Sequence, residues 1–315
     1  MNNITIIGGG VLGSQIAFQS AYSGKKVTIW LRSKESIGRT TPKLEHIKSC
    51  YIEAIEEMDK SINNWCNGIS DVDNFNKEEC LKKVEDAFVN IRIELDMKEA
   101  LKDADLVIES MTEDINTKRD LFIKMSKLLD EKTILVTNSS TILPSKLRNY
   151  TGRSDKFLSL HFANTIWKNN IVEVMKHDKT SDDSFNKVIE FSKEIRMIPL
   201  PLLKEKSGYL LNSMLIPLLF SALDLYVNGV SDFKSIDEAW TKGTGSPKGP
   251  FRILDTVGLK TAYEIVNMYV KTPSFLAPYN FKGMAKLLKQ YIDEGRLGES
   301  TGIGFYEYNI KTTIK

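Results

Sequence analysis

The first 32 residues constrain the fold of this 315-residue chain more than any other stretch. Strand-forming residues 3–7 run directly into Gly8-Gly9-Gly10-Val11-Leu12-Gly13, residues 14–22 read as a helix, and residues 25–31 read as a second strand. In this context a G-x-G-x-x-G pattern places Gly8 in a tight turn, Gly10 where a diphosphate approaches, and Gly13 where helix and strand pack closely. The free N–H groups at the start of this helix face an anion, and Val11 and Leu12, which lead into it, are expected to contact the dinucleotide. The pattern predicts dinucleotide binding; the alternative is a glycine-rich turn in another α/β protein.

The end of the second predicted strand indicates which dinucleotide binds. NAD sites usually carry Asp or Glu there, which accepts hydrogen bonds from the ribose, but this chain has Leu31-Arg32-Ser33-Lys34. A guanidinium can pair bidentately with a phosphate, so Arg32, with Ser33 beside it, suits a 2′-phosphate. We therefore expect NADP(H) to be favoured over NAD(H). The alternative is a solvated basic turn, with NAD held by its other contacts.

Composition argues against several classes of protein. The net charge is +2 with 27% charged residues, which does not indicate a nucleic-acid partner. No apolar run is long enough to span a membrane, and Met1 leads directly into the first strand, so we expect no signal peptide. The three cysteines lack metal-site spacing, and their odd number argues against a disulfide framework. We expect a cytoplasmic protein without a metal.

Residues 34–90 interrupt the alternation of strands and helices. Apolar residues at helical spacing from Leu44 to Met58 predict a long amphipathic helix, followed by a polar break at 61–76 and a second helix at 81–88. This helical insertion either projects over the substrate or is a charged, solvent-facing excursion. The sequence leaves both alternatives open.

The remaining chain predicts an α/β part followed by a helical part. The strands expected after the insertion are 90–95, 105–109, 133–136, 157–161, 170–175 and a short one near 197–198. The helices expected are 115–130, 182–195, 209–227, 251–270 and 281–294, with a docked tail at 302–306. We predict a doubly wound, Rossmann-like NAD(P)-binding domain over 1–200 and an all-helical domain for substrate binding or dimerisation over 201–315.

Polar residues follow these strands at the C-terminal ends, where open parallel sheets bind ligands. Glu113 follows the strand 105–109 in a position suited to a nicotinamide ribose, and Lys118 lies in the next helix. The alternative for this pair is a helix-start acid and an exposed helical lysine. His161 ends the strand 157–161, and Glu173 on the next strand can lie beside it, although the sequence does not determine the register.

Hydride transfer to or from a nicotinamide requires a group that exchanges a proton near neutral pH, and histidine is the usual choice. We expect His161 to be this general acid/base, with Glu173 orienting its ring. Ser140 and Asn212 are expected to donate hydrogen bonds to the reacting oxygen. The alternative for His161 is a structural histidine. His46 and His177 have charged or polar neighbours and are expected at the surface.

A series of motifs occurs in the order typical of one family: Asp105-Leu106-Val107-Ile108-Glu109, Asn138-Ser139-Ser140, Leu160-His161-Phe162, Val172-Glu173-Val174, Gly249-Pro250-Phe251 and Gly302-Ile303-Gly304-Phe305-Tyr306. Over nearly its full length the chain resembles the L-3-hydroxyacyl-CoA dehydrogenase family. It is most similar to the diketoreductase branch, through residues 10–19, 138–145 and 161–164.

The resemblance implies roles for individual residues. His161 is the general acid/base with Glu173 as its partner, and Ser140 and Asn212 contact the reacting oxygen. The cofactor-binding set implied is Glu113, Lys118 and Asn138. The family acts on (3S)-hydroxyacyl thioesters and commonly forms homodimers through the helical domain.

Two departures from the family pattern bear on the substrate. The acid after the second strand is missing, and the family's His-Phe-Phe-Asn-Pro is replaced by a stretch that runs from His161 to Trp167, so we expect Trp167 to reshape the acyl pocket. No position can be assigned to the family's CoA-contacting lysine. The substrate is therefore an acyl-CoA or, alternatively, a non-CoA β-dicarbonyl or 3-oxo acid.

Two other readings of the resemblance are less favoured. A non-catalytic, crystallin-like role gives no physical reason for Ser140, His161, Glu173 and Asn212 to occur together. The β-hydroxyacid dehydrogenases use a lysine one helical turn before an asparagine, but Gly208 stands four residues before Asn212.

Overall fold

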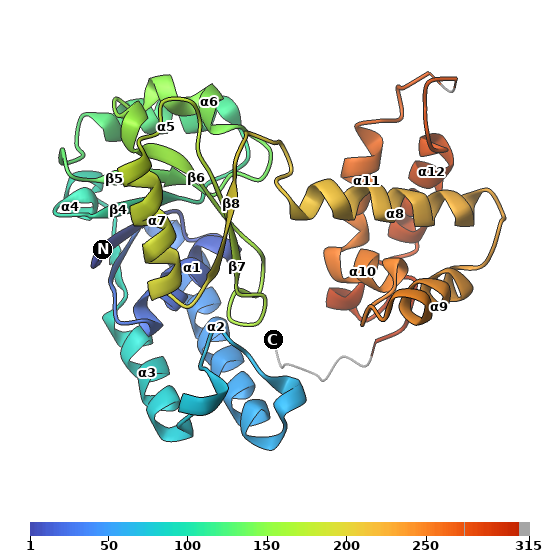
Figure 1. The fold of residues 1–315 in the computed structure, drawn as a ribbon, viewed down its shortest axis with the longest axis horizontal. Helices are drawn as coiled ribbons and strands as arrows, with labels where there is room; N and C mark the ends of the chain where they lie inside the picture. The colour runs from blue at the N-terminus through green and yellow to red at the C-terminus, as the bar shows by residue number, and fades with distance from the viewer. Residues whose placement is uncertain (274, 309–315) are drawn as a thin grey trace. The chain divides into compact units, whose positions relative to one another are not determined.

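The structure, a computed structural model, describes residues 1–273 and 275–308. The chain divides into two compact units, Met1–Leu210 and Leu211–Lys315. The division follows Leu210, whereas the predicted boundary lies at residue 200. In Figure 1 the first unit runs from blue to yellow, and the second is orange and red.

The first unit is built on one eight-stranded sheet of order β3-β2-β1-β4-β5-β6-β7-β8. The strands are β1 Asn3–Ile7, β2 Lys26–Trp30, β3 Arg92–Glu94, β4 Leu106–Glu109, β5 Ile134–Thr137, β6 Phe157–Phe162, β7 Ile171–Met175 and β8 Ile198–Leu202. Neighbouring strands are parallel except for the antiparallel pair β6–β7. The strand order reverses between β1 and β4, which creates the crevice where such sheets bind ligands. The predicted doubly wound, Rossmann-like sheet is confirmed.

Helices cover both faces of this sheet. They are α1 Val11–Tyr22, α2 Lys34–Lys60, α3 Lys77–Asn90, α4 Met97–Leu101, α5 Ile115–Ser126, α6 Pro144–Leu147 and α7 Asp182–Glu194. One apolar cluster joins one face of the sheet to α1, α2, α3 and α7, and a second joins the other face to α4, α5 and α6. Because successive strand residues point to opposite faces, Ile108 packs in the first cluster and Val107 in the second. This two-sided burial explains the continuous apolar runs of the inner strands.

The glycine-rich turn between β1 and α1 has the geometry that its spacing predicts. Gly8 has φ +111°, and a Cβ there would lie 2.8 Å from the Ser110 carbonyl oxygen. A Cβ at Gly13 would lie 2.2 Å from the Gly8 carbonyl oxygen, so only glycine lets α1 start this close to β1. A Cβ at Gly10 would meet nothing within 4 Å, which leaves open space next to the start of α1.

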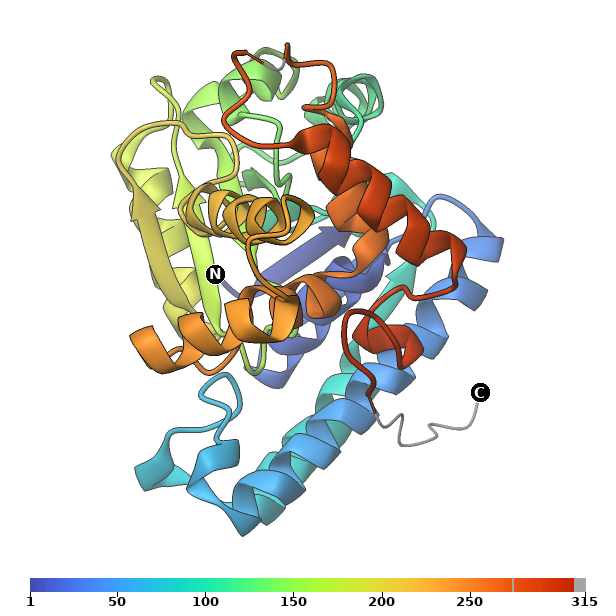
Figure 2. The same cartoon turned by 90° about the vertical axis from the view of Figure 1, so that its right-hand side faces the viewer.

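The residues between β2 and β3 form the predicted helical hairpin, α2 and α3. The five apolar residues whose spacing predicted α2 are buried: Leu44, Ile47, Tyr51, Ile55 and Met58. The Tyr51 ring lies 4.8 Å from that of Phe18 on α1, measured between ring centroids. The hairpin projects beyond the sheet in both ribbon views (Figures 1 and 2), but its inner face shares the core of the sheet domain. It is therefore an integral packing element and not an independent solvent-facing excursion.

The strand β8 is longer than the sequence indicates, because Pro199 and Pro201 suggest a break. The strand lies at the edge of the sheet and pairs only with β7. Ile198 N–H donates to the Asn170 carbonyl oxygen, so alternate residues of β8 point toward β7. Pro199 and Pro201 thus direct their donor-less nitrogens away from the sheet, where an edge strand tolerates proline.

The described residues of the second unit form a helical bundle. Its helices are α8 Leu211–Val227, α9 Phe233–Thr244, α10 Pro250–Val257, α11 Leu259–Asn267 and α12 Phe281–Asp293. The single helix predicted over 251–270 is wrong, because Gly258 has φ +91° and separates α10 from α11. Within residues 1–273 and 275–308, no helix is both long enough and apolar enough to cross a membrane.

The tail docks on α10, as predicted. The Asp255 carboxylate accepts hydrogen bonds from Phe305 N–H at 2.8 Å and Tyr306 N–H at 2.9 Å. A Cβ at Gly304 would collide with this carboxylate, so the close approach of the tail requires glycine. The buried ring of Phe305 then completes the core of the second unit.

Candidate active site

A chain of three polar side chains, two of them buried, lies where β5, β6 and β7 meet. His161 on β6 is the direct antiparallel partner of Glu173 on β7. Its Nδ1 lies 3.0 Å from Glu173 Oε2, and its Nε2 lies 3.1 Å from Oγ of Ser140, which follows β5. His161 is 8% exposed and Glu173 2% exposed. The structure thus brings three of the four predicted catalytic residues together.

This geometry can move a proton at one defined atom. A buried carboxylate at Nδ1 orients the imidazole and stabilises its protonated form. The other ring nitrogen, Nε2, then faces the Ser140 hydroxyl, and proton exchange between Nε2 and a ligand remains a prediction. Asn212, the fourth predicted residue, is the second residue of α8 in the second unit, and its contact with the reacting oxygen remains a prediction.

Two residues that the sequence analysis did not select hold the His161–Glu173 pair. The Tyr209 ring stacks on the imidazole, with 4.5 Å between centroids and 17° between planes. Its hydroxyl donates to the Ser139 carbonyl oxygen at 2.7 Å, and Leu210 N–H donates to Glu173 Oε1 at 2.8 Å. The only sequence signal was an aromatic residue shortly before Asn212.

A second polar cluster, formed by Glu109, Lys118 and Thr137, lies next to the turn after β4. The Glu109 carboxylate, fully buried, accepts from Lys118 Nζ at 2.6 and 2.8 Å and from Thr137 Oγ1 at 2.6 Å. Lys118 is 1% exposed and its Nζ lies 3.8 Å from Glu113. The alternative of an exposed helical lysine is therefore wrong. Lys118 pairs directly with Glu109 and lies close enough to Glu113 to attract its charge.

Glu113 is fixed to the loop that carries Ser140. It accepts hydrogen bonds from Ser139 Oγ at 2.5 Å and from Thr141 N–H at 2.8 Å. Burial alone would raise the pKa of Glu113, but these hydrogen bonds and the Lys118 charge more than offset it and hold that pKa below its usual value. Glu113 is therefore ionised at neutral pH and joins the end of β4 to the end of β5.

Asn138 connects the same strand ends from the other side. Its Oδ1 accepts from Phe162 N–H at 3.0 Å, and its Nδ2 lies 3.5 Å from Ser110 Oγ. The residue is 8% exposed. Its side chain is engaged mainly in tying β6 to the loop after β4, so a cofactor contact by Asn138 remains a prediction.

A pocket of about 360 Å³ lies beside the glycine-rich turn. One wall is the backbone of Gly8, Gly9 and Gly10, and another is formed by residues 30–32 after β2 and by α2. At the start of α1, Val11 is 61% exposed and Leu12 is partly buried. Arg32 is exposed and lines the pocket, whereas Ser33 is the N-cap residue of α2. Among the described residues that line this pocket, none is acidic.

Two further cations line the same pocket and were not selected from the sequence. Arg39 and Lys43 lie one helical turn apart on α2. The available signal was their i, i+4 spacing near the start of a helix that begins directly after the second strand.

The expectation that His177 lies at the surface is wrong. His177 is 3% exposed and is not a surface group; its burial, and the Arg148 guanidinium, lower its pKa to about 4. Trp167 is buried with its ring 5.1 Å from that of Tyr51 on α2. It therefore fastens the segment after β6 to the hairpin, and its effect on an acyl pocket remains a prediction.

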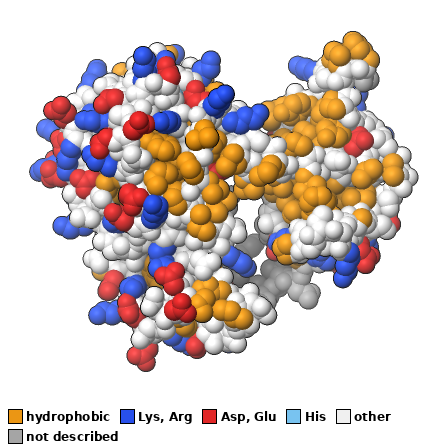
Figure 3. Space-filling view, in the orientation of Figure 1, with side chains coloured by type: hydrophobic (Ala, Val, Ile, Leu, Met, Phe, Trp, Pro, Cys, Tyr) orange, Lys and Arg blue, Asp and Glu red, His pale blue; other side chains and the backbone are white. Residues whose placement is uncertain are grey.

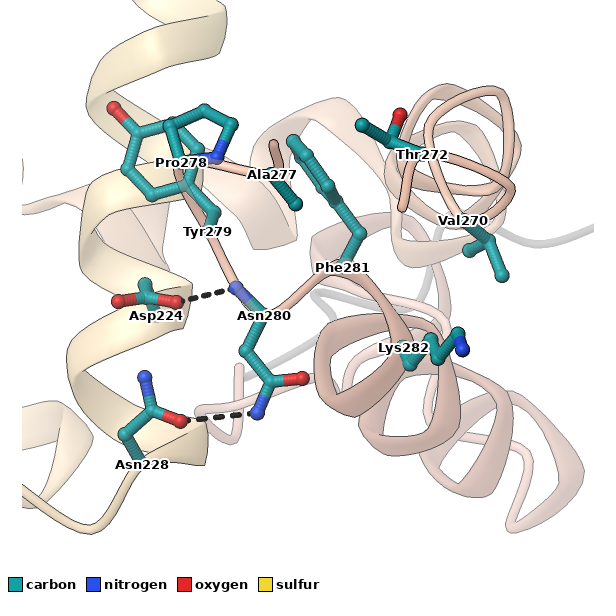
Figure 4. A pocket seen from close by; sticks show the side chains of 10 residues that line it. All are labelled: Asp224, Asn228, Val270, Thr272, Ala277, Pro278, Tyr279, Asn280, Phe281 and Lys282. Carbon is teal, nitrogen blue, oxygen red and sulfur yellow. Dashed lines mark hydrogen bonds between the residues drawn. The ribbon is translucent and has the colours of Figure 1, made fainter. Parts of the chain in front are cut away.

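A pocket of about 380 Å³ in the second unit contains none of the predicted site residues. Figure 4 shows that Asn280 forms its floor: its N–H donates to Asp224 at 2.7 Å and its side-chain amide donates to Asn228 at 2.9 Å. These bonds tie the start of α12 to α8. Within the described residues, no group of three or more His, Cys, Asp and Glu side chains is placed to hold a metal ion.

The fold and this site together are those of a dinucleotide-dependent dehydrogenase. The glycine turn and its adjoining pocket can receive a dinucleotide, and an oriented imidazole lies at the C-terminal ends of neighbouring strands. Distinguishing one dehydrogenase family from another requires a comparison of the whole amino-acid sequence.

Comparison with known proteins identifies that family. Residues 3–206 match the model of the 3-hydroxyacyl-CoA dehydrogenase NAD binding domain, and residues 208–308 match the 3-hydroxyacyl-CoA dehydrogenase C-terminal domain. The chain belongs to the 3-hydroxyacyl-CoA dehydrogenase family and is an oxidoreductase of that type.

Individual relatives cover the whole chain. The human mitochondrial hydroxyacyl-coenzyme A dehydrogenase is 30% identical over 98% of this chain and 91% of its own length. The 3-hydroxybutyryl-CoA dehydrogenase of Clostridioides difficile is 30% identical over 97% and 99% of the two chains. A solved structure of a diketoreductase that acts on dicarbonyl compounds is 42% identical, with a TM-score of 0.84 over 98% of this chain and 99% of that chain.

Proposed function

We propose that this protein interconverts 3-hydroxyacyl and 3-oxoacyl groups, as CoA thioesters, by hydride exchange with a nicotinamide cofactor. The Ser140–His161–Glu173 chain is the observation that carries this proposal, with separations of 3.1 and 3.0 Å. The first unit binds the cofactor, and the second contributes to substrate binding through Asn212.

The chain's own residues handle the proton and the oxygen. A bound nicotinamide supplies the hydride acceptor in oxidation and the donor in reduction. In oxidation, His161 Nε2 takes the proton of the 3-hydroxyl group, and the Glu173 carboxylate balances the resulting charge. Ser140 and Asn212 donate hydrogen bonds to the oxygen as it becomes a carbonyl. Reduction reverses these steps.

The residues around the glycine turn suit a dinucleotide. The open space at Gly10 admits a diphosphate, and the start of α1 offers N–H groups to it. Glu113, held ionised by Ser139 and Thr141, accepts hydrogen bonds from the nicotinamide ribose. Lys118 and Asn138 support this contact by holding Glu113 and the strand ends in place.

We propose NADP(H) as the favoured cofactor, because Arg32 lines the pocket and no acid does so among its described residues. Arg32→Glu should then weaken NADPH binding far more than NADH binding, and Lys48→Glu, on α2 but outside the pocket lining, should leave both unchanged. Calorimetric titration with each cofactor tests this. Equal losses for NADPH and NADH in the Arg32 variant would remove the argument.

Reduction of a non-CoA dicarbonyl compound is the second candidate. It is favoured by the 42% identity to a diketoreductase of known structure and by the altered segment after His161. Loss of reduced-nicotinamide absorbance with acetoacetyl-CoA and, in parallel, with a β-diketo ester separates the two. Turnover of the thioester supports the first candidate, and turnover of the ester alone supports the second.

We further propose that the protein forms a homodimer through the second unit. Successive outward positions of α8 are apolar or small: Leu211, Met214, Pro217, Ser221 and Leu225 are all exposed. Figure 3 shows hydrophobic side chains gathered on the face of the second unit where α8 lies in Figure 1. An exposed apolar helix face of this kind suits burial against a second copy. Light scattering on the intact chain and on Met214→Glu tests this; a monomeric parent protein would contradict it.

A further inference from the structure

We propose that Arg39 and Lys43 on α2 complete, with Arg32, a binding site for the 2′-phosphate of NADPH, so that cofactor choice is set mainly by α2. This inference rests on the proposed nicotinamide cofactor and extends it to two residues outside the turn after β2. The three cations line the same pocket of about 360 Å³ that borders the glycine-rich turn.

The arrangement separates the two anionic parts of the cofactor. The backbone of the glycine turn serves the diphosphate, and the basic side chains lie on the β2–α2 side of the pocket, where the adenosine ribose belongs in this fold. Arg39 and Lys43 are four residues apart and therefore on one face of α2. The start of α2, at Lys34, adds the positive end of a 27-residue helix.

Arg39 is held in place before any ligand arrives. Its guanidinium donates to Ser36 Oγ at 2.9 Å, and Ser36 Oγ lies 3.3 Å from Ser33 Oγ. Ser36 is 8% exposed. Ser33, selected from the sequence as a direct contact, thus serves through this hydroxyl pair to position Arg39, whose fork of donors can pair with a phosphate.

The β2–α2 side of the pocket, in the part of the chain that the structure describes, has no carboxylate to accept a hydrogen bond from the 2′-hydroxyl of NADH. That hydroxyl needs an acceptor, but Leu31, at the end of β2, is 3% exposed and apolar. The neighbouring Glu35 does not line the pocket. Among the described residues of this lining, a 2′-hydroxyl meets only neutral acceptors such as Ser36, whereas a phosphate can pair with its positively charged side chains, so we infer that the pocket favours the phosphate.

Equilibrium binding without substrate tests this inference independently of catalysis. Calorimetric titrations with NADPH, NADH and 2′,5′-ADP are compared for the parent protein, Arg39→Gln and Lys43→Gln. Lys48→Gln is the matched control, because Lys48 lies on α2 outside the pocket and pairs with Glu85 at 2.7 Å. We expect Arg39→Gln to weaken NADPH and 2′,5′-ADP by about 10- to 100-fold and Lys43→Gln by about 3- to 10-fold. NADH should change less than about twofold in every variant.

The outcomes separate this inference from the proposed reaction. An unchanged NADPH-to-NADH affinity ratio in both α2 variants, or tighter NADH binding by the parent protein, would overturn it. Selective NADPH binding without turnover of any acyl or dicarbonyl substrate would leave the inference standing and contradict the proposed reaction. Turnover with NADH, in a protein that binds NADPH no more tightly than NADH, would support the proposed reaction and contradict the inference about α2.

Discussion

Glu173→Gln removes the charge behind the imidazole while keeping the shape of the side chain. In the structure the Glu173 carboxylate lies 3.0 Å from His161 Nδ1, and both groups are buried. Two unit charges at that separation attract by about 5 kcal/mol at an effective dielectric constant of about 20. That attraction is available only when the imidazole is protonated, as it becomes when it takes the hydroxyl proton.

The neutral amide recovers part of this stabilisation as a hydrogen bond, so we expect a net loss of about 3–4 kcal/mol. This corresponds to a fall in kcat of about 10²- to 10³-fold. The variant has one acceptor oxygen where the carboxylate uses two, so either His161 Nδ1–H or Leu210 N–H loses its acceptor. Because a substitution cannot change the equilibrium of the reaction, kcat/KM should fall together in both directions.

Steady-state rates measured through the reduced-nicotinamide absorbance band, with either thioester or diketo ester, test this. Thermal melting and NADPH titration establish that the variant folds and binds cofactor. Glu190→Gln is the matched control, since Glu190 is 63% exposed on α7 and pairs with Lys193. A Glu173→Gln enzyme within about threefold of parental kcat would refute the role given to this carboxylate.

Three further changes probe the site and its support. Lys118→Met should cost about 3–5 kcal/mol in urea unfolding because it leaves the Glu109 carboxylate buried without its cation; unaltered stability would contradict this, and adding Glu109→Gln should recover much of the loss. His177, with its pKa lowered to about 4 from 6.5, binds a proton more readily when unfolded, so stability should fall by up to about 3 kcal/mol as pH drops from 6.5 toward 4. His177→Gln should flatten that slope, and an unchanged slope would refute the assignment. Tyr209→Leu should lower kcat about 3- to 10-fold and shift the pH–rate profile by unstacking His161, whereas Tyr209→Phe keeps the ring and should retain both; equal behaviour of the two variants would argue against positioning by stacking.

The spacing of residues along the chain predicted most of the fold. The glycine turn requires three backbone conditions within six residues, and each is met in the structure at Gly8, Gly10 and Gly13. The long helix α2 follows from buried apolar residues at helical intervals. The prediction failed where the local preference of proline conflicted with strand pairing. Pro199 and Pro201 suggested a domain boundary, but they lie in the edge strand β8, which accepts prolines whose nitrogens point away from the sheet.

The residue types at the site were also predicted from the sequence, because an acid/base histidine, a carboxylate and a hydroxyl are a small set of chemical requirements. The contacts between these residues could not be predicted. His161 and Glu173 are in contact only because β6 and β7 pair antiparallel in one register, and a shift of one residue would turn the two side chains to opposite faces.

The amino-acid sequence therefore dictated what depends on neighbours along the chain: the βαβ nucleotide unit, the amphipathic hairpin and the chemistry available at strand ends. Tertiary structure alone decided burial and pairing between distant segments. It paired Lys118 with the buried Glu109, buried His177, stacked Tyr209 on His161 and placed Arg39 in the pocket beside the glycine turn. The physical reason is that the exposure and partners of a polar side chain depend on contacts across the sheet and between layers, which no local pattern of residues encodes.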